Sequence, residues 1–301
     1  MSTELSGVLL IHKPEGKTSH DVVGAVRRLY HTRRVGHTGT LDPMATGVLV
    51  VLVGRAAKAA EYLSVKSKSY RAVMRLGLTT DTEDTTGKTL TVSGDIPSPA
   101  HVCEVVNGFV GEILQTPPMY SALKVNGQKL CDLARRGIEV EREARPITIH
   151  AISCKHIEEN DYELLVSCSS GTYIRTLCAD IGKALGCGGA MAALCRTETG
   201  GFPLEDCHTI EELDALDDEA RAAWLLPTEQ LFAELPAVFL PAFYEKLCRS
   251  GCEIYQKKIG TDHAVGARVR LCDEKGTFFA LGEVREYEIG SAIKSIKMFD
   301  I

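Results

Sequence analysis

The sequence has no long hydrophobic run. Its longest uninterrupted aliphatic stretch is Val48–Val53, which is far shorter than the roughly 20 residues that cross a bilayer as a helix. The opening residues, MSTELSG, lack the basic and apolar regions of a secretory signal. We therefore expect a cytoplasmic protein with no membrane partner.

Cysteine pairs and regular metal-binding motifs are also missing. The chain has 11 cysteines, an odd number, and none of them forms a Cys-x-x-Cys pair. Cysteines of this kind are typical small apolar side chains of a reducing compartment. The nearest approach to a metal site is Cys248 with Cys252, joined by His263 and Cys272. Their irregular spacing does not match structural zinc sites, so we expect no metal.

The usual nucleotide and hydrolase motifs are absent. Two Gly-Lys-Thr triplets occur, at 16–18 and 87–89. A phosphate-binding loop needs a glycine five residues before the second glycine, and those positions hold Ile11 and Thr82. No Gly-x-Gly-x-x-Gly, His-Glu-x-x-His or Gly-x-Ser-x-Gly sequence is present. These absences argue against nucleotide cofactors, zinc proteases and serine hydrolases.

Charge is distributed unevenly along the 301 residues. The net charge is −6, yet residues 1–76 hold 12 basic and 5 acidic side chains, whereas residues 205–235 hold 1 and 10. A basic quarter of this kind is a hint of polyanion binding on one face. Two unrelated solvated surfaces are an equally open interpretation. The length predicts one large domain followed by a smaller one.

Hydrophobic spacing predicts the elements of the first half. Apolar residues at helical spacing predict a helix with Ser19 as its N-cap and Leu29 near its end. Further predicted elements are a buried strand at 48–53, a short helix at 55–63, a strand at 68–78, a polar loop or insertion at 79–99, and a helix at 100–114.

The second half alternates strands and helices. Asn126-Gly127 predicts a hairpin turn, followed by a helix in the DLARR segment. Strands are predicted at 146–153 and 162–170, then a helix that carries Ile174 and ends at Gly186. The acidic segment 205–235 is expected to form surface helix and linker. Beyond it, a helix at 241–250 and short strands predict a β-rich domain of about 65 residues.

The most unusual segment is the glycine-rich loop Gly36–Gly47, which leads into the buried strand at Val48. Within it, Asp42 precedes Pro43, an order typical of a turn or a helix N-terminus. A single loop histidine such as His37 is more often structural than catalytic. On these general grounds alone, the loop has no assigned chemistry.

This loop, together with Gly7–Pro14 and Lys17–Asp21, resembles the TruB family of bacterial tRNA pseudouridine synthases. The resemblance continues in family order through segments 68–70, 81–84, 117–124, 170–175 and 194–197. It covers residues 7 to about 230. The remaining residues fit the family's PUA-like RNA-binding domain mainly by position and size.

The resemblance implies an α+β pseudouridine synthase fold, with a large mixed, mainly antiparallel sheet flanked by helices and a small C-terminal PUA-like β-rich domain. The catalytic domain is expected at 1–235 and the RNA-binding domain at 236–301. The implied reaction isomerises uridine 55 in the T loop of tRNA, with no cofactor and no guide RNA. A monomer is expected, and a tRNA-folding chaperone role is also implied.

Two other functions remain open. One is the guide-RNA-dependent relative found in archaeal and eukaryotic particles, although the basic tails of those proteins are missing here. The other is an RNA chaperone without chemistry. The presence of Asp42, Tyr70 and Arg175 together favours retained chemistry, because folding RNA needs no buried carboxylate.

By resemblance, Asp42 is the nucleophile and attacks either C1′ of the ribose or C6 of the base. Arg175 pairs with it and keeps it ionised. The target base must be flipped out, and aromatic stacking offsets part of that free energy. The implied base-binding residues are Tyr70, which also takes the C5 proton, Tyr173, His37 and Leu194.

Without the family, Tyr70 and Tyr173 are ordinary strand and core aromatics. Lys13 and Lys58 are expected on the surface that faces the RNA phosphates. Further basic side chains expected there are Lys17, Arg27, Arg28, Arg33, Arg34, Lys66 and Lys68.

Overall fold

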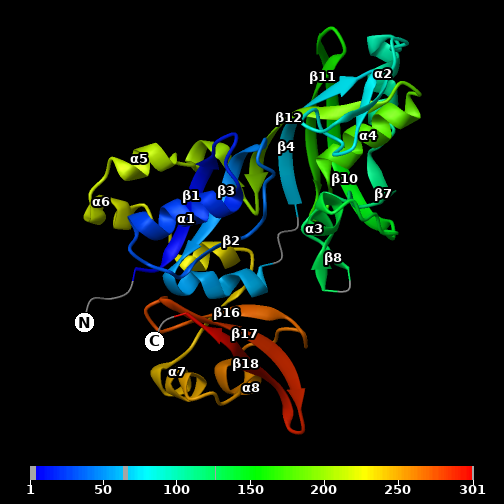
Figure 1. The fold of residues 1–301 in the computed structure, drawn as a ribbon. Coiled ribbons are helices and arrows are strands. Elements are labelled where there is room, and N and C mark those ends of the chain that lie inside the picture. Colours follow the sequence, from blue (N-terminus) through cyan, green and yellow to red (C-terminus); the bar gives the residue numbers. More distant parts are fainter. Residues whose placement is uncertain (1–4, 64–66, 126, 300–301) are drawn as a thin grey trace.

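The computed structural model describes residues 5–63, 67–125 and 127–299 and contains two main sheets (Figure 1). The larger sheet has nine strands, in the order β1-β3-β12-β4-β11-β10-β7, with β2 paired to β3 and β13 to β12. Its strands are β1 Gly7–Lys13, β2 Val35–His37, β3 Thr46–Val53, β4 Ser67–Leu76, β7 Gly111–Gln115, β10 Arg145–Glu158, β11 Asp161–Ser169, β12 Gly189–Thr199 and β13 Phe202–Pro203. All pairings are antiparallel except β12 with β3, which confirms the mixed, mainly antiparallel sheet.

Helices cover this sheet in two lobes (Figure 1). Helix α1 (Ser19–Leu29) and the short helix α5 (Ile210–Asp214) pack on β1 and β3, and α2 (Pro99–Asn107) and α4 (Ile174–Ala184) lie on the lobe formed by β4, β10, β11 and β12. Strand β3 is buried on both faces, which explains its continuous aliphatic sequence.

The C-terminal residues form a separate five-stranded sheet in the order β14-β16-β17-β18-β15. Its elements are β14 Ala237–Phe239, α7 Ala242–Arg249, β15 Ile254–Tyr255, α8 Gln256–Ile259, β16 Arg268–Cys272, β17 Phe278–Tyr287 and β18 Gly290–Met298. The sheet has its own apolar core around Phe279 and Ile293. It also packs through Leu281 and Phe299 against Ala59 and Phe232 of the larger part.

Several predicted elements are confirmed with changed ends. Helix α1 is N-capped by Thr18, not Ser19, because Thr18 and Asp21 form a reciprocal capping box. The helix expected at 55–63 is a 3-10 helix, η1 (Gly54–Tyr62). The helix expected at 100–114 ends at Asn107. The prediction is wrong beyond that point, because Gly111, with φ +113°, begins edge strand β7.

The polar segment 79–99 is more ordered than expected. Strand β5 (Leu78–Thr80) pairs with β6 (Thr89–Val92), so two short strands interrupt the predicted loop, while residues 81–88 and 93–98 contain no regular helix or strand. Strand β12 was not predicted. The hairpin at 126–127 is confirmed by the pairing of β8 (Lys124–Val125) with β9 (Gln128–Lys129), followed by α3 (Leu130–Arg135); Asn126 itself lies outside the described residues.

The acidic segment forms short helices, as expected: η2 Leu204–Asp206, α5, α6 Asp218–Ala223 and η3 Thr228–Phe232. It also covers the free edge of β1, since the Val8 amide donates to the Leu226 carbonyl at 2.8 Å and the His208 amide to the Leu10 carbonyl at 3.0 Å. The helices expected to follow Gly171 and Pro241 and the later short strands are confirmed. No helix within the described ranges is long and apolar enough to cross a membrane.

Candidate active site

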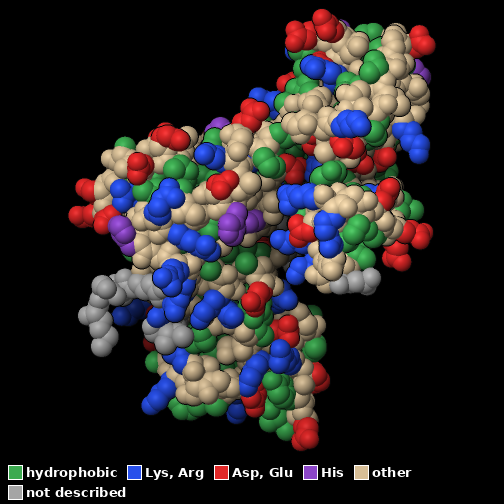
Figure 2. Space-filling model, viewed as in Figure 1, with side chains coloured by type: hydrophobic (Ala, Val, Ile, Leu, Met, Phe, Trp, Pro, Cys, Tyr) green, Lys and Arg blue, Asp and Glu red, His purple; other side chains and the backbone are tan. Residues whose placement is uncertain are grey.

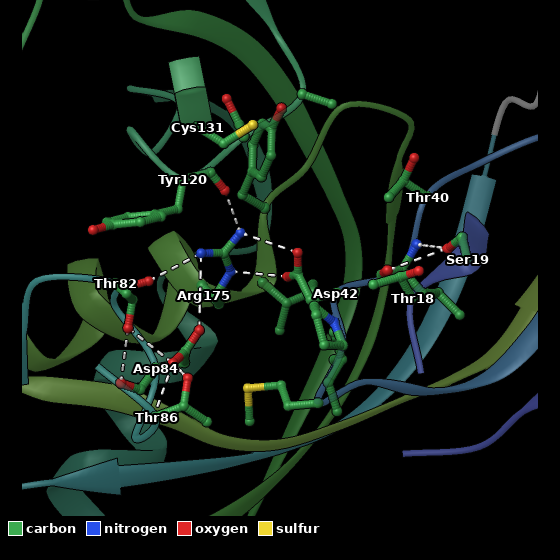
Figure 3. A pocket seen from close by; sticks show the side chains of 18 of the residues that line it. Thr18, Ser19, Thr40, Asp42, Thr82, Asp84, Thr86, Tyr120, Cys131 and Arg175 are labelled. Carbon is green, nitrogen blue, oxygen red and sulfur yellow. Dashed lines mark hydrogen bonds and ion pairs between the residues drawn. The ribbon is translucent and has the colours of Figure 1, made fainter. Parts of the chain in front are cut away.

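A cavity that contains Asp42 and Arg175 in its lining has a volume of about 1210 Å³. It lies where the glycine-rich loop before β3, the hairpin β5–β6, the loop before α3 and the start of α4 meet (Figure 3). Lys and Arg side chains gather on this face of the molecule, on the α1 lobe and along the hollow between the lobes (Figure 2). The predicted residues Asp42, Tyr70, Arg175, Tyr173, His37 and Leu194 all line the cavity.

Asp42 and Arg175 form a two-point ion pair at the cavity wall (Figure 3). Arg175 Nε lies 2.9 Å from Asp42 Oδ2 and Arg175 Nη2 lies 3.3 Å from Asp42 Oδ1. The Asp42 side chain is 36% exposed, whereas that of Arg175 is 6% exposed. The pair therefore presents a carboxylate to the cavity while its cation stays inside the protein.

Arg175 is fixed by two further segments, the turn between β5 and β6 and the loop before α3 (Figure 3). Its Nη1 donates to the Thr82 carbonyl at 3.0 Å and its Nη2 to the Tyr120 carbonyl at 2.7 Å. Asp84 Oδ2 lies 3.9 Å from Nη1. Asp84 is buried, and its Oδ1 accepts hydrogen bonds from Thr82 Oγ1 and from the amide and hydroxyl of Thr86.

Asp84 was not predicted as a site residue, although it belongs to the matching segment 81–84. Its position next to Arg175 depends on the turn between β5 and β6, which the sequence presented only as a polar stretch.

Burial raises the pKa of Asp42, and the neighbouring Arg175 opposes this shift; the like charge of Asp84 raises the pKa further. A raised pKa makes a carboxylate a better proton acceptor and a stronger nucleophile once it is ionised. Arg175 is the contact that keeps the ionised form accessible in the cavity.

Tyr70 lies on β4 and is nearly buried, with 7% of its surface exposed. Burial raises the pKa of its phenol. Arg196 on β12 lies directly opposite Tyr70 in the sheet, and its positive charge opposes this rise in pKa; the sequence did not single out Arg196. Leu194, two residues earlier on β12, lines the cavity, and its carbonyl accepts a hydrogen bond from Thr46 Oγ1 at 3.4 Å.

The other two predicted base-binding residues are held by their backbone surroundings. Tyr173 is the N-cap residue of α4. Gln115 donates to its carbonyl at 3.1 Å and accepts from its amide at 2.8 Å. His37 Nδ1 accepts a hydrogen bond from the Gly39 amide at 3.3 Å, and burial lowers the pKa of its imidazole.

Lys13 does not lie on the surface, so the expectation that it faces the RNA phosphates is wrong. It is 0% exposed, and its Nζ donates to the carbonyls of Lys17 at 2.6 Å, Pro14 at 2.8 Å and Pro43 at 3.2 Å. Burial lowers its pKa to about 8. Lys13 therefore ties β1 to the residue after Asp42. Lys58 is exposed on η1, outside the cavity lining.

Within the described ranges, no three His, Cys, Asp or Glu side chains are grouped as metal ligands. Cys248 and Cys272 are buried and Cys252 is exposed. The cavity thus offers a paired carboxylate, a buried phenol and backbone groups as its reactive features. This set is suited to nucleophilic and acid–base chemistry on a ring that enters the cavity.

Comparison with known proteins shows which proteins this chain is similar to. The model of the TruB family pseudouridylate synthase N-terminal domain matches residues 27–174, and that of the tRNA pseudouridylate synthase B C-terminal domain matches residues 175–233. The chain is 41% identical to the tRNA pseudouridine synthase B of Clostridium kluyveri over 98% of this chain and 100% of that protein. The corresponding enzyme of Bacillus subtilis is 43% identical over 92% of both chains.

Solved structures show the same fold. The structure of a Cbf5–Nop10–Gar1 complex superposes with a TM-score of 0.70 at 27% identity, covering 98% of this chain and 85% of that chain. The structure of an H/ACA RNP bound to a substrate RNA containing 2′-deoxyuridine gives a TM-score of 0.73 at 26% identity, with the same coverage.

The fold and the Asp–Arg cavity define a pseudouridine synthase. The chain belongs to the TruB family. It is accordingly an isomerase that forms pseudouridine in tRNA.

Proposed function

We propose that this enzyme isomerises uridine 55 in the T loop of tRNA, in the cytoplasm, as a monomer and without a guide RNA. The observation that carries the proposal is the Asp42–Arg175 pair at the cavity wall, with Tyr70 lining the same cavity. Identity of 41–43% to two tRNA pseudouridine synthase B enzymes over nearly the whole chain supports the substrate.

In the proposed reaction, the Asp42 carboxylate attacks C1′ of the ribose or C6 of the uracil, and the N1–C1′ bond breaks. The uracil turns within the cavity and C5 bonds to C1′. Tyr70 then accepts the proton that C5 must lose. Arg175 remains paired with Asp42, and its two carbonyl contacts keep it in place while the carboxylate reacts.

Access to the cavity requires the uridine to leave the T-loop stack, at a cost of a few kcal/mol. Stacking on an aromatic ring contributes about 1–3 kcal/mol per base, and we assign this role to Tyr70 with support from Tyr173. His37 is proposed to displace the base, and the Leu194 backbone to contact the uracil edge. Lys58 is proposed to contact phosphates. Residues 1–235 act as the catalytic domain and 236–301 as the RNA-binding domain.

The test is a single-turnover assay with an unmodified tRNA transcript, protein alone, and pseudouridine mapped at every uridine. We expect wild type to convert one T-loop uridine. Asp42→Asn should bind the transcript with near-normal affinity and convert none, because an amide is not a nucleophile at this site. Glu15→Gln, a change at an exposed cavity-lining carboxylate, is the matched control and should retain activity.

Near-normal turnover by Asp42→Asn would remove the nucleophile assignment. A requirement for added guide RNA would instead favour the guided mode of the archaeal relatives. The chaperone role is tested by the same variant, because refolding of misfolded tRNA by Asp42→Asn needs binding and no chemistry.

A further inference from the structure

Arg196 is the largest fully buried side chain of the described residues, with 1% of its surface exposed. It projects from β12, and its Nε donates to the Val48 carbonyl at 2.8 Å. Its Nη2 donates to the Gly39 carbonyl at 3.1 Å. In the pairing of β12 with β4, Arg196 lies directly opposite Tyr70, so the two side chains project from the same face of the sheet. Arg196 therefore links the glycine-rich loop and β3 to the aromatic residue of the cavity.

The charge of Arg196 has no carboxylate partner in the part of the chain that the structure describes. A buried cation without a counterion is costly. Its neighbours increase that cost, because Arg196 lowers the pKa values of Lys13, His37 and Lys68 by charge repulsion. The groups that favour its charge are Tyr70 and, more weakly, Cys207.

The groups that face Tyr70 come from three elements. Arg196 on β12 lowers the pKa of the phenol, while Cys168 on β11 and Asp42 on its loop raise it. Burial also raises the pKa of the Cys168 thiol, so Cys168 is neutral near pH 7. Arg196 is thus the group whose positive charge directly favours a negative oxygen on Tyr70.

We infer that Arg196 is a positioning residue for Tyr70: it fixes the phenol oxygen in the cavity and stabilises the negative charge that this oxygen carries before it accepts the C5 proton. The inference rests on the proposed function and deepens it. The active site then has two arginine-supported groups, Asp42 with Arg175 and Tyr70 with Arg196.

Tyr70 first loses its phenol proton to water. Its oxygen then takes the proton from C5, and the C5–H electron pair becomes part of the C5–C6 double bond of pseudouridine. The displaced pair goes to N1, which takes a proton from water, if Asp42 attacked C1′. If the attack was at C6, the Asp42 carboxylate leaves with the C6–O electron pair, and N1, which became negative when the N1–C1′ bond broke, takes its proton from water.

The experiment measures single-turnover rates across neutral and alkaline pH for wild type, Arg196→Gln, Arg196→Lys, Tyr70→Phe and the double variant Tyr70→Phe with Arg196→Gln. Arg221→Gln is the matched control, because Arg221 is also a poorly exposed arginine that donates to backbone carbonyls but lies outside the cavity lining. Far-UV circular dichroism and tRNA affinity report folding of each variant.

We expect Arg196→Gln to be at least about tenfold slower at pH 7 and to need a higher pH for the same rate, since each unit of pKa shift changes the phenolate fraction about tenfold. Arg196→Lys should recover part of the rate. Arg196→Gln should add no further loss in the Tyr70→Phe background, and Arg221→Gln should keep the wild-type profile.

The inference would be overturned if Arg196→Gln lowered the rate by the same factor at every pH. It would also be overturned if Arg196→Gln slowed the Tyr70→Phe variant as much as it slows wild type. Either result is expected of a residue with a purely structural role. If wild type forms no pseudouridine, the proposed function fails instead. The role of Arg196 is then tested on the free protein by alkaline absorbance titration. The difference between the titration curves of wild type and Tyr70→Phe gives the ionisation of Tyr70. The same ionisation should occur at higher pH when Arg196→Gln is present. An unchanged titration contradicts the inference.

Discussion

The Asp42 carboxylate is held on one side and open on the other. Arg175 occupies both of its oxygens, yet 36% of the side chain remains exposed to the cavity. A fully buried pair would be inert toward a substrate, and a fully solvated carboxylate would be a weak nucleophile at the ordinary pKa. The half-open arrangement combines access with a raised proton affinity.

The pH dependence of the chemical step should therefore reflect Asp42. Burial raises its pKa above the ordinary 3.8, so the reactive carboxylate is present above that raised pKa and is lost as pH falls through it. We expect Asp42 to add a second ionisation to that of Tyr70, so that the single-turnover rate at saturating enzyme falls more steeply with decreasing pH below a midpoint above 3.8. A slope that did not steepen down to pH 4 would contradict this.

At the residue scale, the family resemblance predicted which residues line the cavity, but it did not predict that Lys13 and Arg196 are buried. Asp42, Tyr70 and Arg175 line one cavity, as expected. Lys13 appeared to be one more basic side chain of a basic segment, because sequence gives the charge of a lysine but not the three carbonyls that surround its Nζ. The same reason hid Arg196, whose partners Gly39 and Val48 lie more than a hundred positions away.

Helix α4 and strand β12 approach each other unusually closely. A Cβ built on Gly182 of α4 would lie 2.1 Å from the backbone nitrogen of Gly189 on β12. Helix α4 carries Arg175 and β12 carries Arg196. The close approach at Gly182 and Gly189 therefore packs the end of the helix that begins with Ile174 and Arg175 against the start of the strand that carries Arg196.

We expect Gly182→Ala to separate α4 from β12. Because the obstructing atoms belong to the backbone, the added methyl group should lower the free energy of unfolding by about 1–3 kcal/mol. The pseudouridylation rate should also be lower. The matched control is Gly24→Ala in α1, where a Cβ meets nothing within 4 Å; helix propensity predicts a gain of up to about 1 kcal/mol. Denaturant unfolding measures both. Equal stabilities would show that the close approach is unimportant.

At the element scale, apolar periodicity correctly predicted the helices that have one clear apolar face. It failed for segments whose structure is determined by pairing with distant strands. Helices α1 and α4 have clear apolar faces and were predicted. Strand β12 contains alanines, cysteine and charged residues, and it is a strand because β4 and β3 flank it. Residues 111–114 have apolar residues compatible with a helix, but pairing with β10 makes them β7.

The two parts of the molecule are joined by an aromatic cluster and by arginines. Phe232 of η3 contacts Phe278 and Phe299 of the C-terminal part, with ring centroids 6.1 and 5.8 Å apart. Arg270 pairs with Glu229 and donates to the Leu235 carbonyl at 2.9 Å. These contacts fix the C-terminal sheet beside η1, below the α1 lobe in Figure 1.

Phe232→Ala should loosen this junction, because Phe232 is only 4% exposed and removal of a buried phenyl ring costs about 3–5 kcal/mol. We expect lower unfolding free energy and faster proteolysis between the two parts. Phe243→Ala is the control, since Phe243 is 67% exposed, and its effect should stay within about 0.5 kcal/mol. Denaturant unfolding and limited proteolysis compare them, and equal effects would contradict the proposed junction.

The contacts of Arg175 have a consequence for the time at which activity appears during folding. Its partners come from Asp42, from Thr82 and Asp84 of one turn, and from Tyr120, which are three places widely separated along the chain. Contacts between such distant positions form late, because long loops must close first. A nascent or partly folded molecule thus has no assembled nucleophile, and recovery of pseudouridylation during refolding reports the completed tertiary structure rather than the formation of helices.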